Sequence, residues 1–150
     1  MLGSTICVVL VDSSAVIRRN IREYLAGADD IRVTAEADNG PEALDLVVQH
    51  QPDVVVLDAH MPGQNCVETV RQLRSQGSTV GILILVLSED SPSIKLAIDA
   101  GANGYALQSS PIEEVIEAMW AVHEANQVLV QIGRRTRNDL RGEVSRNSTP

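Results

Sequence analysis

The sequence of 150 residues is poor in aromatic side chains: it has no phenylalanine, two tyrosines and one tryptophan. A surface that stacks nucleic-acid bases needs several aromatic rings, so this chain lacks the residues for one. Lysine is also scarce: Lys95 is the only one in the sequence. In total there are 12 basic and 20 acidic residues, which gives a net charge of −8. Since binding to phosphate backbones depends on clustered lysine and arginine, we expect this chain to bind no nucleic acid.

Cysteines and long apolar runs are few as well. Cys7 and Cys66 are too few for a disulfide framework or a zinc motif, and we interpret both as small buried hydrophobic residues. No run reaches the roughly 18–20 apolar residues of a membrane span. Asp12 interrupts the apolar segment near the start, which has no basic flank and does not resemble a signal peptide. We therefore expect a cytoplasmic protein with no membrane partner.

The composition changes near the end of the chain. Residues 1–132 alternate between apolar and amphipathic segments and have the length of one ordinary domain. Residues 133–150 are polar and contain five arginines. We interpret residues 1–132 as one folded domain and residues 133–150 as a flexible polar tail or interdomain linker.

Five short apolar segments indicate strands. Ile6–Val11, Asp53–Asp58 and Gly81–Leu87 are continuous and rich in β-branched residues, which is typical of strands buried on both faces in a parallel sheet. Ile31–Ala37 alternates apolar and polar residues, as a half-exposed edge strand does. Gly104–Leu107 is a shorter and weaker fifth segment.

Five amphipathic segments follow these strands in alternation. Each has apolar residues at helical spacing that we expect to face inward: Ile17, Ile21 and Leu25; Leu44, Val47 and Val48; Val67, Val70 and Leu73; Ile94, Ala97 and Ile98; Val115, Ile116, Met119 and Val122. Right-handed crossovers between such units produce an open parallel sheet with helices on both faces. The sequence therefore predicts an α/β fold with a doubly wound, five-stranded parallel sheet.

Polar residues follow four of the predicted strands. Asp12 follows the first strand, Asp58 ends the third, Ser88 follows the fourth and Gln108 the fifth. Sites in open α/β sheets lie at the carboxyl ends of the strands, so we expect these four side chains to meet in one shallow acidic site. Paired carboxylates can hold Mg²⁺, and an aspartate can accept a phosphoryl group.

Several segments together resemble the receiver domain of response regulators from two-component signalling. These segments are Val9–Asp12, Val55–Asp58 with Met61–Gly63, Val86–Ser88 and Ala100–Leu107. The resemblance covers about residues 5 to 130, and Ser109–Glu114 resembles the LuxR/NarL subgroup, whose full-length members carry a DNA-binding domain. It implies a flavodoxin-like three-layer fold with strand order 2-1-3-4-5.

The resemblance also implies roles for individual residues. Asp58 would be the phosphoacceptor, and Asp12, Asp58 and the backbone carbonyl of His60 would be ligands of Mg²⁺. Ser88 would be the switch hydroxyl that bonds the phosphoryl group, and Tyr105 the switch aromatic. The expected partner for phosphoryl transfer is a histidine kinase, and the chain itself would not be an enzyme. The first and fifth helices are the expected surface of a homodimer.

Two positions depart from the family pattern and leave two functions open. Ser13 stands where the family has a second acid that binds the metal, and Gln108 stands where it has a lysine that pairs with the phosphoryl oxygens. Serine and glutamine supply neutral groups instead of charges, so we expect Mg²⁺ to bind weakly. The chain is then either a phosphotransfer receiver or a pseudo-receiver that serves as an interaction or dimerisation module without phosphorylation.

Overall fold

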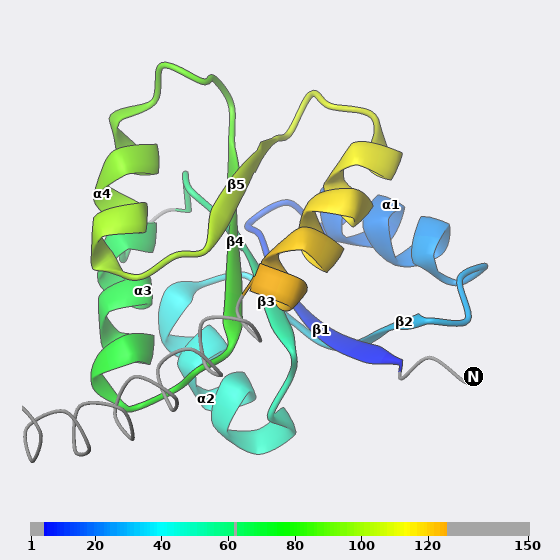
Figure 1. The fold of residues 1–150 in the computed structure, drawn as a ribbon, viewed down its shortest axis with the longest axis horizontal. Coiled ribbons are helices and arrows are strands. Elements are labelled where there is room, and N and C mark those ends of the chain that lie inside the picture. Colours follow the sequence, from blue (N-terminus) through cyan, green and yellow to red (C-terminus); the bar gives the residue numbers. More distant parts are fainter. Residues whose placement is uncertain (1–4, 62, 126–150) are drawn as a thin grey trace, which may run out of the picture.

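The computed structural model describes residues 5–61 and 63–125. They form a five-stranded parallel sheet in the predicted order β2-β1-β3-β4-β5 (Figure 1). In chain order the elements are β1 (Ile6–Val11), α1 (Ala15–Leu25), β2 (Ile31–Ala37), α2 (Gly40–His50), β3 (Val54–Asp58), α3 (Cys66–Ser75), β4 (Gly81–Val86), α4 (Pro92–Ala100) and β5 (Gly104–Leu107). A further helix follows over residues 112–125, and we call it the C-terminal helix.

Helices cover both faces of the sheet. Helices α2, α3 and α4 pack on one face, and α1 and the C-terminal helix pack on the other (Figure 1). Along β3, Val55 and Leu57 point into the first of these cores, whereas Val54 and Val56 point into the second. Because the central strands are covered on both sides, every residue of β3 and β4 is buried. This arrangement explains their continuous apolar sequences.

Side-chain caps set where the helices begin beside the carboxyl edge of the sheet. The Oγ of Ser14 accepts the N–H of Ile17 at 3.2 Å, so α1 begins directly after the loop that carries Asp12. The Oδ1 of Asn65 accepts the N–H of Val67 at 2.7 Å and so begins α3. Such caps satisfy N–H groups that have no partner inside the helix. They therefore fix the residues at which α1 and α3 begin.

Three residues lie on the surface although the sequence predicted them to be inside or within a strand. β4 ends at Val86 and Leu87 is 63% exposed, because the pairing of β4 with β5 stops at Val86 and Leu107. Val48 on α2 and Ile98 on α4 are exposed as well. Each follows a buried residue of its helix directly, and one step along a helix turns the side chain by about 100°, away from the core.

Other predictions have mixed outcomes. Cys66 is buried as expected, but Cys7 is only half-buried, and both are free thiols. Residues 126–132 of the predicted domain and the predicted tail, residues 133–150, lie outside the described residues. Within residues 5–61 and 63–125, none of the helices combines the length and the hydropathy needed to cross a bilayer.

Candidate functional site

Three of the four predicted site residues come together at the carboxyl edge of the sheet. Asp12 follows β1, Asp58 ends β3 and Gln108 follows β5. The Nε2 of Gln108 donates to the Oδ1 of Asp58 at 3.0 Å, although the two residues are 50 positions apart in the chain. The backbone N–H of Gln108 donates to the carbonyl of Val86 at 2.8 Å. This bond holds Gln108 beside the last residue of β4. Parallel strands thus gather these polar groups as predicted.

Asp58 lies at the centre of the site and is 4% exposed. Its Oδ1 accepts the backbone N–H of His60 at 2.9 Å in addition to the Gln108 amide. Both donors are neutral, so no cationic side chain hydrogen-bonds this carboxylate within the described part of the chain. The Asp58 charge also acts on the buried thiol of Cys66, where burial first and Asp58 second raise the pKa.

Asp12 is the second buried carboxyl group and is 3% exposed. Its Oδ1 accepts the N–H of Ser14 at 2.8 Å, whereas its Oδ2 has no hydrogen-bond partner among the described residues. Burial raises the pKa of Asp12 to about 6, and the neighbouring carboxyl group of Asp58 adds to the rise, while the Ser14 N–H and the Arg18 charge oppose it. The carboxyl groups of Asp12 and Asp58 therefore lie close together in a buried environment with little solvent.

Arg18 is a neighbour of this site that the sequence analysis did not assign to it. Its guanidinium donates through Nη1 to the backbone carbonyl of Asp12, and its Nε pairs with Glu36 at 3.2 Å. Glu36 also pairs with Arg22 on the same helix. The available signal was the position of Arg18 on the first turn of a helix that begins directly after Asp12, because such a residue lies close to the preceding loop.

Ser88 makes a local hydrogen bond rather than one to the other three residues. Ser88 is exposed two positions beyond β4, and its Oγ accepts the backbone N–H of Asp90 at 3.1 Å. The β4 residue that pairs with Asp58 is Leu85, and Val86 follows it, so apolar side chains flank the acidic pair at this strand. In the described ranges no hydrogen bond joins Ser88 to Asp12, Asp58 or Gln108. This exposed position follows from the early end of β4.

Three further predicted residues lie around the site. Ser13 is exposed, next to the buried Asp12. The side chain of His60 is exposed, and its backbone N–H, rather than its carbonyl, is the group seen in contact with Asp58. Tyr105 lies on the edge strand β5 and is 42% exposed, so its ring is outside the sheet core. No group of three acidic, histidine or cysteine side chains that could hold a metal occurs among the described residues.

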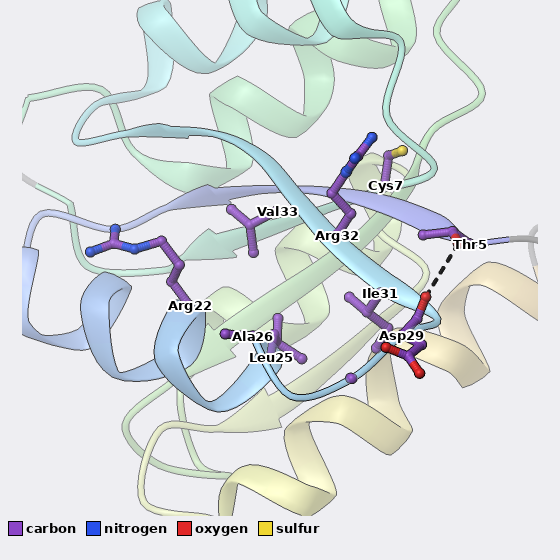
Figure 2. A pocket seen from close by; sticks show the side chains of 10 residues that line it. Thr5, Cys7, Arg22, Leu25, Ala26, Asp29, Ile31, Arg32 and Val33 are labelled. Carbon is purple, nitrogen blue, oxygen red and sulfur yellow. Dashed lines mark hydrogen bonds between the residues drawn. The ribbon is translucent and has the colours of Figure 1, made fainter.

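A separate open groove lies at the opposite, amino edge of the sheet, beside β2 (Figure 2). It has a volume of about 540 Å³ and contains none of the residues of the acidic site. Arg22 and Arg32 both line it, but their guanidinium groups are well separated in Figure 2, and Arg22 is already paired with Glu36. The groove therefore lacks a pair of cations that converge on one anion.

Comparison with known proteins places this geometry in a family. The family model described as "Response regulator receiver domain" matches residues 8–119. The nitrate/nitrite response regulator protein NarP of Escherichia coli K12 is 37% identical over 121 residues, which are 81% of this chain and 56% of NarP. The transcriptional regulatory protein LnrK of Bacillus subtilis 168 is 31% identical over 122 residues, 81% of this chain and 56% of LnrK. The chain thus spans somewhat over half the length of these curated relatives.

A solved structure agrees with the sequence comparison. The signal receiver domain of the putative response regulator NarL from Mycobacterium tuberculosis superposes with a TM-score of 0.76 at 27% identity, covering 81% of this chain and 98% of that domain. Its fold is flavodoxin-like, with the strand order found here. The residue pattern, the sheet order and these relatives agree, and the chain belongs to the response regulator receiver domains of the LuxR/NarL type.

Proposed function

We propose that this chain is a phosphoryl-accepting receiver, with Asp58 as the acceptor and a histidine kinase as the donor. The observation that supports this function best is the position of Asp58, buried beside Asp12 at the carboxyl edge of the sheet. Both N–H groups that bond the Asp58 carboxylate end on Oδ1. The other oxygen, Oδ2, accepts neither of these N–H groups, and we propose it as the nucleophile.

The proposed reaction forms an acyl phosphate. An oxygen of Asp58 attacks the phosphorus of a phosphohistidine on the kinase, the P–N bond breaks, and a new O–P bond forms. The leaving imidazole keeps the electron pair of the broken bond and takes up a proton from the solvent. Phosphoryl transfer depends on positioning, and the His60 N–H and the Gln108 amide hold the Asp58 carboxylate in place through Oδ1. The chain acts as an acceptor in this reaction and not as an enzyme with its own substrate.

Mg²⁺ is the cofactor that we propose for this site. The carboxylates of Asp12 and Asp58 and the backbone carbonyl of His60 are oxygen donors of the kind that Mg²⁺ binds while keeping several waters. The buried, unpartnered Oδ2 of Asp12 fits a cation, because a buried charged oxygen needs a compensating partner. When bound, the ion would supply positive charge to the phosphoryl oxygens. Ser13 provides at best a neutral oxygen, so we expect an affinity reduced by at least about 10-fold relative to a site with a third carboxylate.

A second function is supported by a different observation. The donors around Asp58 are neutral, and the hydroxyl of Ser88 is exposed and engaged with Asp90. A phosphoryl group on Asp58 would thus meet no lysine charge, and the Ser88 oxygen already accepts the Asp90 N–H. These features favour a pseudo-receiver, which keeps the fold as an interaction or dimerisation module and is not phosphorylated.

Phosphorylation with a small donor distinguishes the two functions. Wild-type protein incubated with acetyl phosphate and Mg²⁺ should gain the mass of one phosphoryl group in intact-mass spectrometry, and Asp58→Asn should gain none. A receiver with the usual two acids and lysine, treated in parallel, provides the reference for complete labelling. Wild-type protein that stays unlabelled while the reference is labelled would contradict the proposed function and support the pseudo-receiver.

Restoring the missing charges tests whether Ser13 and Gln108 limit the proposed reaction. Ser13→Asp combined with Gln108→Lys should raise the labelling rate by at least about 10-fold, since it returns a metal-binding acid and a cation to the site. The matched control replaces Gln108→Lys by Ser109→Lys, which adds the same charge one residue away on an exposed position. An equal increase in both proteins would show that a lysine at position 108 has no special role.

We extend the proposal to the context of the receiver. The relatives named as regulators of transcription support a role in controlling transcription through a DNA-binding domain outside this sequence. Phosphorylation would alter a partner or dimer surface, for which α1 and the C-terminal helix are the expected elements. The cytoplasm is the proposed location, because both the kinase that phosphorylates a regulator and the DNA that the regulator controls are accessible there.

A further inference from the structure

A small hollow lies between α1 and the C-terminal helix, next to the acidic site. Its volume is about 180 Å³, and it is lined by eight residues: Ile17, Asn20, Ile21, Leu85, Gln108, Ser110, Ile112 and Val115. Five of the eight are aliphatic and belong to the core on this face of the sheet or pack against it. None of the eight carries a charge, although the protein has a net charge of −8. The hollow is therefore a neutral, mostly apolar place on an acidic protein.

Three polar side chains border this hollow with unused hydrogen-bonding groups. The carboxamide of Asn20 and the hydroxyl of Ser110 have no hydrogen-bond partner within residues 5–61 and 63–125. Gln108 uses its Nε2 for Asp58, while its Oε1 accepts no hydrogen bond from this part of the chain. A mostly apolar lining with a few polar groups is the usual composition of a small-molecule site. The apolar residues would bind a ring, and the polar groups would bond a polar substituent.

We propose that this hollow binds a small neutral molecule that has an apolar body the size of one ring and a single amide-type group. An engineered cavity of about 150 Å³ lined by apolar side chains binds benzene, so a hollow of about 180 Å³ has room for a ring with a small substituent. An anion finds no cationic side chain among the eight lining residues, and a cation finds no carboxylate there. This proposal goes beyond the phosphoacceptor function and holds whether or not Asp58 is phosphorylated.

Gln108 connects the hollow to Asp58. The same side chain lines the hollow and donates to the Oδ1 of Asp58 at 3.0 Å, and the N–H of His60 shares that oxygen. A molecule that hydrogen-bonds the Gln108 carboxamide changes how strongly Gln108 donates to Asp58. The N–H of His60 then reports binding from outside the hollow, because its hydrogen bond ends on the same oxygen.

Titration with benzamide, followed by ¹H–¹⁵N NMR of the ¹⁵N-labelled protein, tests the proposal. We expect saturable shifts of the side-chain amides of Asn20 and Gln108 and of the backbone N–H groups of Ser110 and His60. Toluene, which lacks the amide, and benzoate, which carries a negative charge, should each bind at least about tenfold more weakly. Equal affinity for either of them would contradict the proposed class of ligand.

Two variants keep this test specific to the hollow. Ile112→Phe fills the space and should weaken benzamide binding by at least about tenfold, whereas Val48→Phe, which adds the same ring at an exposed position on α2, should leave it unchanged. Asn20→Leu, on an exposed turn of α1, removes one polar group without filling the core. If Ile112→Phe does not fold, Asn20→Leu is the variant whose benzamide binding should be weakened. Absence of saturable shifts in the wild type, or equal binding by wild type and a folded Ile112→Phe, would overturn the proposal.

Discussion

At the scale of single residues, the protonation of Asp12 differs between the folded and the unfolded chain. Burial and the Asp58 carboxyl group hold the pKa of Asp12 at about 6, compared with 3.8 for a solvated aspartate. The folded protein therefore binds a proton more readily than the unfolded chain between these two values. By linkage, the contribution of Asp12 to stability is greatest below about pH 4 and is lost as the pH rises through about 6.

We expect Asp12→Asn to become more favourable as the pH rises. Asparagine keeps an acceptor for the Ser14 N–H but has no charge to desolvate. The free energy of unfolding of the variant, measured by urea denaturation relative to the wild type, should rise by about 2 kcal/mol between about pH 4.5 and about pH 7.5. Asp45→Asn, on an exposed position of α2, is the control and should show no such difference. A pH-independent effect of Asp12→Asn would contradict the raised pKa.

The sequence predicted the meeting of Asp12, Asp58 and Gln108 because it depends only on strand order and on polar residues at strand ends. The position of Ser88 depends on where β4 stops, and the apolar run continues one residue past that point to the exposed Leu87. Apolar character does not distinguish the last paired residue of a strand from the first residue of a loop. The contact of Arg18 with the Asp12 carbonyl depends on a side-chain conformation that residue spacing does not specify.

At the scale of elements, Arg74 holds the end of α3 against the neighbouring loops. Its guanidinium donates to the carbonyl oxygens of Gly101 and Ser78 at 3.0 Å each and of Val80 at 2.7 Å, and to the Oδ1 of Asn103 at 2.9 Å. Burial lowers the pKa of Arg74, and all four acceptors are neutral. The arginine thus connects α3 to the start of β4 and to the turn between α4 and β5.

We expect Arg74→Met to lower the free energy of unfolding by about 2–4 kcal/mol, because it leaves three partly buried carbonyl groups without these donors. Arg74→Lys should recover only part of this loss, since an ammonium group cannot reproduce the planar fork of donors. Urea denaturation measures both changes. Arg71→Met is the matched control on the same helix: Arg71 is exposed and pairs with Glu68, so its loss should cost no more than about 1 kcal/mol. Equal losses of unfolding free energy for Arg74→Met and Arg71→Met would contradict this role of Arg74.

The turn at the end of α4 depends on the same arginine. Gly101 has a φ of +124°, and a Cβ at this position would lie 2.6 Å from the Cγ of Arg74. The sequence predicted the end of α4 at this glycine, because glycine commonly ends helices. Helical spacing predicted the elements themselves but placed Val48 and Ile98 inside, since it does not specify how wide an apolar stripe the sheet can cover.

At the scale of the whole molecule, the two helices beside the proposed ligand hollow are also the expected dimer surface. Tyr24 on α1 is 45% exposed and donates its hydroxyl to Glu113 of the C-terminal helix at 3.1 Å. Tyr105 has a similar exposure on β5, the edge strand at one end of the sheet. The two tyrosines therefore form a matched pair for locating an interface.

We expect sedimentation velocity to show a dimer whose fraction rises with protein concentration. Tyr24→Arg should weaken this dimer at least about tenfold, because it replaces the ring by a charged side chain that is costly to desolvate in an interface even when Glu113 pairs with it. Tyr105→Arg should leave the dimer constant unchanged. If Tyr105→Arg is the variant that dissociates the dimer, the interface lies at β5 and not at α1 and the C-terminal helix.

The order of the sheet could be predicted from the sequence because five strand–helix units with right-handed crossovers permit few arrangements. The hollow beside Gln108 could not, since it results from how closely α1 and the C-terminal helix approach over Leu85. Packing distances between helices depend on the sizes of all the side chains between them, and no local pattern encodes them.

Gln108 bonds two strands at once, through its backbone to Val86 on β4 and through its side chain to Asp58 on β3. It also follows β5 directly, so a single residue joins the ends of three adjacent strands. Any chemical change at Asp58 that withdraws its Oδ1 from this amide would loosen the outermost strand at its carboxyl end first. The border of the sheet that carries Tyr105 is thus connected to Asp58 through one side chain.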